Sequence, residues 1–368
     1  MNNPSTNGTR LESLTFLRFI AALVVVIYHF GKNTTLHDIL PSALTSGPIM
    51  VTFFFVLSGF VISTAYYGRD FATSSFYKNR FFRIAPIYLI ALFATAALQP
   101  SAANSTSLIL SATFLQSWIP GHAISINFPG WSISVEAFFY ALSPALLIIA
   151  NSANKPSWKS WVAASILIWI VTQSVLSALL DPTFYKGYKT FSHDLIYYFP
   201  VSHLTSFVLG FSAGVAFHQN KGNHFVSPST ASILFVVSLL AAGYVIQNLA
   251  SVQSTFGVNL AFGSSFLALL FMPMIYFCAI GDSIIKKYLA LPIMVLLGEA
   301  SYGMYILQKP VFVAFNSIDV VSTLSPDARF FVYAAFLLII SVASFMLIES
   351  PITKAFKRTR PALFPQPQ

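Results

Sequence analysis

The chain has 368 residues, of which 56% are hydrophobic and only 8% are charged, and its mean hydropathy is +0.72. Soluble domains carry about 25% charged residues, so this composition excludes a soluble globular protein and predicts an all-α integral membrane protein. The single cysteine, Cys278, excludes a disulfide framework and a thiolate metal site. Zinc, P-loop and dinucleotide motifs are absent from the sequence, so we expect no metal.

Ten apolar stretches predict a bundle of about ten transmembrane helices, and one further segment, 106–118, is too short to cross about 30 Å of hydrocarbon. The polar start and the lack of a small-residue cleavage site predict an uncleaved first span. We expect a cytoplasmic segment 1–13, a transmembrane domain 14–349 and a basic cytoplasmic tail 350–368. The expected spans are residues 14–30, 49–67, 84–99, 132–150, 160–180, 196–217, 229–250, 259–280, 290–315 and 330–349.

The basic residues between the spans predict the orientation. With ten spans and a cytoplasmic N-terminus, fourteen basic residues are inside and four are outside, whereas a crossing by 106–118 would give eight inside and ten outside. The positive-inside rule therefore favours ten spans with both termini cytoplasmic, and the net charge of +9 needs no nucleic-acid partner. The inside set is Arg10, Arg69, Lys78, Arg80, Arg83, Lys155, Lys159, Lys221, Lys286, Lys287, Lys354, Lys357, Arg358 and Arg360, and the outside set is Lys32, Lys186, Lys189 and Arg329.

The first span carries two ionisable residues, Arg18 and His29, eleven positions apart. At about 100° per residue they share one helix face, about 16 Å apart along the axis. An ionisable group inside a bilayer normally faces a protein interior or a water-filled cavity. The alternative is an arginine that snorkels to the headgroups and a histidine at the other interface.

Arg80 and Arg83 share a face at the expected start of the third span, on the cytoplasmic side. Two guanidinium groups at a helix N-terminus suit a phosphate group, because arginine donates in a fork and the helix end adds positive potential. The alternative is ordinary positive-inside anchoring.

The fourth span begins WSISVE on the outer side, where Trp131 is typical of an aromatic-belt anchor. Glu136 lies at a depth similar to that of His29, so the two are candidates for a base and its orienting partner. A structural ion pair is the alternative reading of Glu136.

Further charges, Glu299, Lys309 and Glu349, are intramembrane groups that each need a partner. Gly210 and Gly214, although they match G-x-S-x-G, are expected to form a close helix-packing face rather than a nucleophile elbow.

Taken together, the motifs resemble the acyltransferase family 3 membrane proteins across nearly the whole chain. The motifs are Arg18 and His29 with ten residues between them, Ser58-Gly59-Phe60, the Arg80 and Arg83 pair before Ile-Ala-Pro, WSISVE ending at Glu136, SYGMYIL at 301–307 and Glu349-Ser350-Pro351. One departure is that Gln308, Lys309 and Pro310 follow SYGMYIL, where many members carry a histidine and a proline.

The resemblance implies an O-acyltransferase of the bacterial inner membrane that uses acyl-CoA, usually acetyl-CoA, and a hydroxyl acceptor on a carbohydrate or glycolipid. It implies His29 as general base with Glu136 orienting it, Arg18, Arg80 and Arg83 as the acyl-CoA site, and Ser58, Trp131, Lys309 and Glu349 as supporting residues. A rival hypothesis is a transporter or flippase in which His29, Glu136, Glu299 and Lys309 form a proton or substrate pathway.

Overall fold

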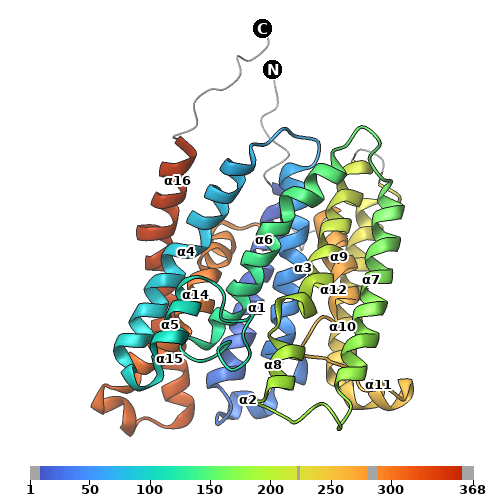
Figure 1. Cartoon of the computed structure of the whole chain (residues 1–368). Coiled ribbons are helices and arrows are strands. Elements are labelled where there is room, and N and C mark those ends of the chain that lie inside the picture. The colour runs from blue at the N-terminus through green and yellow to red at the C-terminus, as the bar shows by residue number, and fades with distance from the viewer. Residues whose placement is uncertain (1–8, 222–223, 281–287, 359–368) are drawn as a thin grey trace.

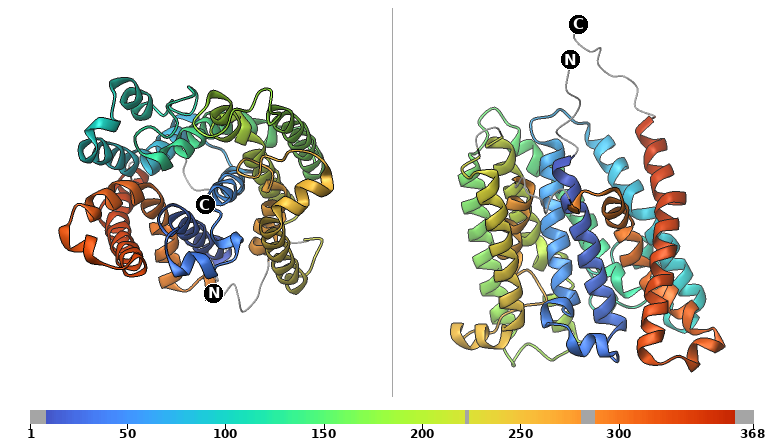
Figure 2. Two further views of the ribbon diagram at one scale, coloured as in Figure 1. Left: turned by 90° about the horizontal axis from the view of Figure 1, so that it is seen from below. Right: turned by 180° about the vertical axis from the view of Figure 1, so that it is seen from behind.

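The computed structural model describes residues 9–221, 224–280 and 288–358 (Figure 1). Residues 1–8 of the expected N-terminal segment, residues 359–368 of the expected tail, and the basic residues Lys286, Lys287 and Arg360 lie outside the described residues. The described part is a bundle of helices and contains no strand. The long helices lie roughly parallel or antiparallel to one another, as Figure 2 shows from two further directions.

Within the described ranges, eight helical stretches are long and apolar enough to cross a membrane, and they confirm the all-α membrane fold. The remaining two predicted spans correspond to α12 and α14. The long helices are α1 (Thr9–Phe30), α3 (Gly47–Tyr66), α4 (Thr73–Leu98), α6 (Trp131–Ala150), α7 (Trp158–Leu179), α9 (Pro200–Gln219), α10 (Pro228–Gln247), α12 (Ala268–Ile280), α14 (Pro292–Asn316) and α15 (Pro326–Ser344).

Shorter helices gather at the two ends of the bundle (Figure 1). We call the end where α1 begins and α16 (Ser350–Arg358) finishes the α16 end, and the other the α2 end. The α2 end carries α2 (Thr35–Ile39), α5 (Ser105–Ala112), α8 (Phe191–Tyr197) and α11 (Leu249–Phe256). Short 3-10 turns are η1 (Ser42–Leu44), η2 (Pro100–Ala102), η3 (Phe128–Gly130) and η4 (Asp319–Thr323).

The 106–118 segment does not cross the bundle, as the sequence predicted. Its helix α5 has eight residues and spans about 12 Å. Because α4 ends and α6 begins at the α2 end, the segment between them stays at that end (Figure 1).

The expected spans 259–280 and 330–349 differ from the structure in where the regular helix begins or ends. The 259–280 span is helical only from Ala268, because Ser264 and Ser265 instead bond backbone far away in the sequence. Thr52 Oγ1 donates to the Ser264 carbonyl at 2.5 Å, and the hydroxyls of Ser264 and Ser265 donate to the Ser202 carbonyl at 3.3 and 2.9 Å. The last span was expected to end at Glu349, but a π-helical turn, Phe345–Glu349, joins α15 directly to α16.

Helices α3 and α9 form the closest helix pair in the bundle. A Cβ atom built on Gly210 would lie 1.8 Å from the Val56 carbonyl oxygen, and one on Gly214 would lie 1.8 Å from Ser63 Oγ. No side chain fits into such gaps, so both positions require glycine for the helices to meet. This confirms the predicted packing face and positions α3 along the interior of the bundle.

Cysteine labelling tests the sides of the membrane. We expect Ala153→Cys and Ser229→Cys, at the α16 end, to be protected from an impermeant external reagent, and Asn33→Cys, at the α2 end, to be labelled. All three positions are exposed, and the wild-type protein serves as the blank because its Cys278 is buried. Labelling of Ala153→Cys and Ser229→Cys in intact cells, with protection of Asn33→Cys, would reverse the orientation.

Candidate active site

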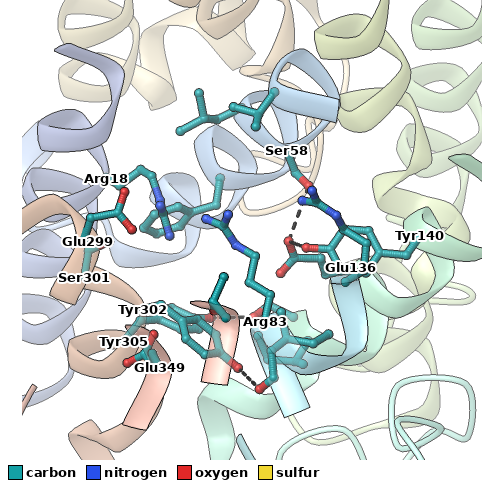
Figure 3. A pocket seen from close by; sticks show the side chains of 18 of the residues that line it. Arg18, Ser58, Arg83, Glu136, Tyr140, Glu299, Ser301, Tyr302, Tyr305 and Glu349 are labelled. Atoms are coloured by element: carbon teal, nitrogen blue, oxygen red, sulfur yellow. Dashed lines mark hydrogen bonds between the residues drawn. The ribbon is translucent and has the colours of Figure 1, made fainter. Parts of the chain in front are cut away.

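A cavity of about 370 Å³ lies inside the bundle and is bounded by α1, α3, α4, α6, α14 and the π-helical turn (Figure 3). Its volume lies within the range of about 300–1,000 Å³ typical of small-molecule sites. Ser350, Thr353 and Lys354 of α16 line it, so it extends toward the α16 end. The charged lining residues are Arg18, Arg80, Arg83, Lys354, Glu136, Glu299 and Glu349.

Three arginines point into this cavity without an ion-pair partner. Arg18 comes from α1, and Arg80 and Arg83 come from α4. Within the described residues none of their nitrogen atoms lies within 4.0 Å of a carboxylate oxygen, and the ion pair found there is His37 with Asp38. Although Arg83 lies in the middle of the bundle, it is exposed because its side chain extends into the cavity (Figure 3). The three guanidinium groups are therefore available to an anion that enters.

Arg80 is surrounded by aromatic rings rather than by acids. Its Cζ lies 5.9 Å from the ring of Tyr66 and 5.8 Å from the rings of Phe76 and Tyr140. Its Nε is buried and has no hydrogen-bond partner among the described residues. Aromatic faces stabilise the cation and still leave its donors free.

We expected the N-terminus of the third span to add positive potential at Arg80 and Arg83, and this expectation is wrong. Helix α4 begins at Thr73, so Arg80 and Arg83 lie about 10 and 15 Å inside it, beyond the first turn, where the helix dipole acts. The expected span began only at residue 84, because it was defined by an apolar stretch and the first turns of α4 are polar. The pair acts through side-chain charge alone.

The carboxylates of the cavity come from three elements. Glu136 accepts hydrogen bonds from Tyr140, one turn along α6, and from Ser58 Oγ of α3 at 3.4 Å. Glu299 of α14 lies beside Arg18 (Figure 3). Glu349 ends the π-helical turn and accepts from Ser344 Oγ at 3.4 Å. With all groups ionised, four cationic side chains face three carboxylates, which leaves one net positive charge.

His29 is not among the residues that line the cavity. It lies in the last turn of α1, at the α2 end, and is exposed. Its ring lies 4.3 Å from the ring of Phe128 and 4.9 Å from that of Tyr28. Within the described residues no hydrogen bond joins His29 to Glu136 or to any other group. The sequence placed His29 and Glu136 at similar depth, but the structure gives them different surroundings and shows no contact between them among the described residues.

A wall of residues separates the cavity from His29. Ser132 and Tyr305 line the cavity, and their hydroxyls are 2.9 Å apart. Both also donate to the Pro129 carbonyl, at 3.0 and 3.3 Å. Phe128, the residue before Pro129, contacts His29 on the other side. The wall is therefore the η3 turn and the start of α6.

Helix α3 extends from the cavity to the region beside His29. Val51 of α3 lines the cavity, and Gly47 begins the same helix four residues earlier, about 6 Å away. Gly47 packs against Tyr28, since a Cβ there would lie 2.7 Å from Tyr28 Cβ. His29 follows Tyr28 and lies about three turns along α1 from Arg18, which lines the cavity.

Two other predicted residues have specific surroundings. Trp131 is not an interfacial anchor as expected: it is 8% exposed, and its ring lies 5.1 Å from the rings of Tyr198 and His203. It packs inside the bundle, against the end of α8 at Tyr198 and the first turn of α9 at His203. Lys309 is half-buried and donates to the Ile126 carbonyl.

Sequence reasoning missed several lining residues, namely Tyr140, Tyr302 and Tyr305. Tyr140 had a signal, because it follows Glu136 by four residues and so shares its helix face. Tyr302 and Tyr305 lie in the SYGMYIL motif but carry no charge that would mark them. Among the described residues no group of three His, Cys, Asp or Glu side chains is placed to hold a metal.

Comparison with known proteins identifies the family. A family model described as "Acyltransferase domain" matches residues 11–349. The chain is 32% identical over 178 residues to Acyltransferase MdmB of Streptomyces mycarofaciens, covering 44% of this chain and 45% of that protein. It is 23% identical to Putative O-acetyltransferase SACOL0978 of Staphylococcus aureus (strain COL), covering 97% and 60% respectively.

A third relative covers both chains almost fully. Exopolysaccharide production protein ExoZ of Rhizobium meliloti (strain 1021) is 24% identical over 91% of this chain and 96% of that protein. By contrast, the matches span only about half the length of the first two relatives. No solved structure matches the chain.

Proposed function

This chain belongs to the acyltransferase domain family, and from that premise we propose that it moves an acyl group, preferably acetyl, from cytoplasmic acyl-CoA to a hydroxyl group on the outer side of the membrane. The names of the relatives support O-acyl transfer. The exopolysaccharide relative supports a carbohydrate or glycolipid acceptor. In this proposal the α16 end faces the cytoplasm of a bacterial inner membrane.

The observation that carries the proposal is the convergence of three guanidinium groups without ion pairs in one cavity. The cationic groups of Arg18, Arg80 and Arg83 suit the diphosphate of CoA, since charge-assisted bonds from arginine to phosphate are short and strong. A CoA thioester is larger than this cavity, so its nucleotide stays at the mouth near Lys354. The pantetheine arm then leads the thioester toward the wall.

In this mechanism the acceptor reaches His29 from the α2 end. Its hydroxyl oxygen attacks the thioester carbonyl while the imidazole takes the hydroxyl proton. The C–S bond breaks, the ester forms, and the thiolate leaves and is protonated to CoA. His29 is exposed and does not line the cavity. Transfer therefore requires the contact between Ser132 and Tyr305 to open while both substrates are bound.

Donor binding can be tested before any acceptor is identified. We expect CoA to raise the melting temperature of the purified protein more than dephospho-CoA, and pantetheine to raise it least, because each step removes phosphate groups that the cationic cavity binds. The effect should weaken at high salt. Equal stabilisation by CoA and pantetheine would contradict a phosphate site.

A turnover assay distinguishes the proposed acyltransferase from the rival transporter hypothesis. Purified protein with radiolabelled acetyl-CoA and candidate glycans should release CoA and label the glycan. A transporter or flippase would leave the thioester intact while moving its substrate. Absence of thioester cleavage with every donor and acceptor class, alongside transport into vesicles, would favour the rival.

A further inference from the structure

Residues 126–131, which include the η3 turn of the wall beside His29, are held in place mainly by side chains from other elements. Bonds reach this segment at five of its six residues, since the hydroxyls of Ser132 and Tyr305 donate to the Pro129 carbonyl. Lys309 donates to the Ile126 carbonyl, Asn127 Nδ2 donates to the Ile306 carbonyl at 3.0 Å, Gln116 Nε2 donates to the Gly130 carbonyl at 2.7 Å, and Ser117 Oγ donates to the Trp131 carbonyl at 2.8 Å.

Lys309 is the one charged side chain among these contacts. Its Nζ donates to Ile126 and also lies 5.8 Å from the ring centre of Phe128. Within the described residues it has no carboxylate within 4.0 Å. Lys309 therefore does not anchor an ion pair. A half-buried ammonium without a counter-ion is retained only where a carbonyl and an aromatic face replace water around it.

The Phe128 ring connects this lysine to His29. The two rings are 4.3 Å apart at an interplanar angle of 47°, and Phe30 packs beside both. The second side-chain torsion of histidine is intrinsically broad. Because no hydrogen bond to a described residue fixes the imidazole, the orientation of His29 depends on the rings that contact it.

We propose that Lys309 is a positioning residue for His29, acting by fixing the 126–131 segment so that Phe128 holds the imidazole. This inference rests on the proposed role of His29 as general base. A base works only within hydrogen-bond reach of the proton that it removes, about 2.6–3.2 Å. A misplacement of about 1 Å can cost a hundredfold in rate. Lys309 does not itself touch either substrate.

The test compares Lys309→Met, which keeps the length of the stem but removes its donor and charge, with Lys309→Arg. We expect Lys309→Met to lower kcat about ten- to a hundredfold with KM for acetyl-CoA unchanged, and Lys309→Arg to recover part of the loss. Lys186→Met is the matched control. Lys186 also donates to a backbone carbonyl, that of Pro182 at 2.9 Å, but on an exposed loop.

A second measurement does not depend on activity. In protein labelled with ¹³C at the histidine Cε1, the His29 signal, assigned by its loss in His29→Ala, should shift or broaden in Lys309→Met and in Phe128→Leu but not in Lys186→Met. The double variant of Lys309 and Phe128 should lose no more activity than the worse single variant. If Lys309→Met does not fold, Phe128→Leu still tests whether the Phe128 ring orients the His29 imidazole.

The outcomes separate this inference from the proposed function. An unchanged His29 signal and normal kcat in folded Lys309→Met, with His29→Ala inactive, would overturn the positioning role alone. A wild-type protein that never cleaves acyl-CoA would overturn the proposed function, while the signal would still report whether Lys309 orients the ring. Additive losses in the double variant would show that Lys309 acts independently of Phe128.

Discussion

His29→Ala is expected to lower acyl transfer about a hundred- to ten-thousandfold while leaving donor binding intact, because a general base contributes about this much and the imidazole does not line the donor cavity. Transfer of label from acetyl-CoA to the acceptor measures the first effect. The melting-temperature shift with CoA measures the second. His37→Ala is a matched control. His37 lies in α2 at the same end of the bundle, where its imidazole is 4.0 Å from the Asp38 carboxylate.

Glu136→Gln should behave differently from His29→Ala. Its carboxylate is bonded to Tyr140 and Ser58 inside the cavity, so we expect a change in donor affinity of similar size in both the wild-type and the His29→Ala backgrounds. Near-normal turnover in folded His29→Ala protein would overturn the general-base role. If Glu136→Gln changes donor affinity only when His29 is present, the two residues act together, as the sequence suggested.

Replacement of a single cavity arginine should cause the second-largest loss, which we expect in donor affinity. We expect Arg83→Ala or Arg80→Ala to weaken donor affinity about ten- to a hundredfold, because each removes charge-assisted bonds worth about 1.5–3 kcal/mol. Arg18→Ala belongs to the same class, since its guanidinium faces the same space. Lysine should restore only part of the affinity because it cannot form the fork.

Arg69→Ala is the matched control for the arginine variants. Arg69 is an exposed arginine at the same end of the bundle and does not line the cavity. We expect its donor affinity to equal that of the wild-type protein at physiological salt. If all three cavity variants bind CoA like Arg69→Ala, the cavity arginines serve only orientation in the membrane.

The spans were predictable because each one is a run of apolar residues long enough to cross the bilayer. The departures arise where hydropathy carries no information. Helix α4 already starts at Thr73 and continues through Arg80 and Arg83. These charged side chains do not interrupt the helix, because they face a cavity rather than lipid. The 259–267 stretch is not a regular helix because its hydroxyls bond to Ser202, some sixty residues earlier, which no local pattern reveals.

The site was predictable only in part. Intramembrane charges such as Arg18 and Glu136 mark functional positions in the sequence. Which of them meet depends on how the helices pack around one another, and this brings Glu299 of α14 beside Arg18 of α1 (Figure 3). For the same reason the sequence did not show that Glu136 bonds to Tyr140 and Ser58, with no contact to His29 among the described residues. Equal depth on two helices does not give the direction in which each side chain points.

Opening of the wall would move a charge within the bundle. If water enters the cavity, which is lined by seven charged side chains, it would carry the potential of one side of the membrane toward Pro129 and Phe128. One elementary charge moved through 100 mV corresponds to about 2.3 kcal/mol. Because the Lys309 ammonium donates to the Ile126 carbonyl beside these residues, its displacement on opening would make the opening step depend on the membrane potential.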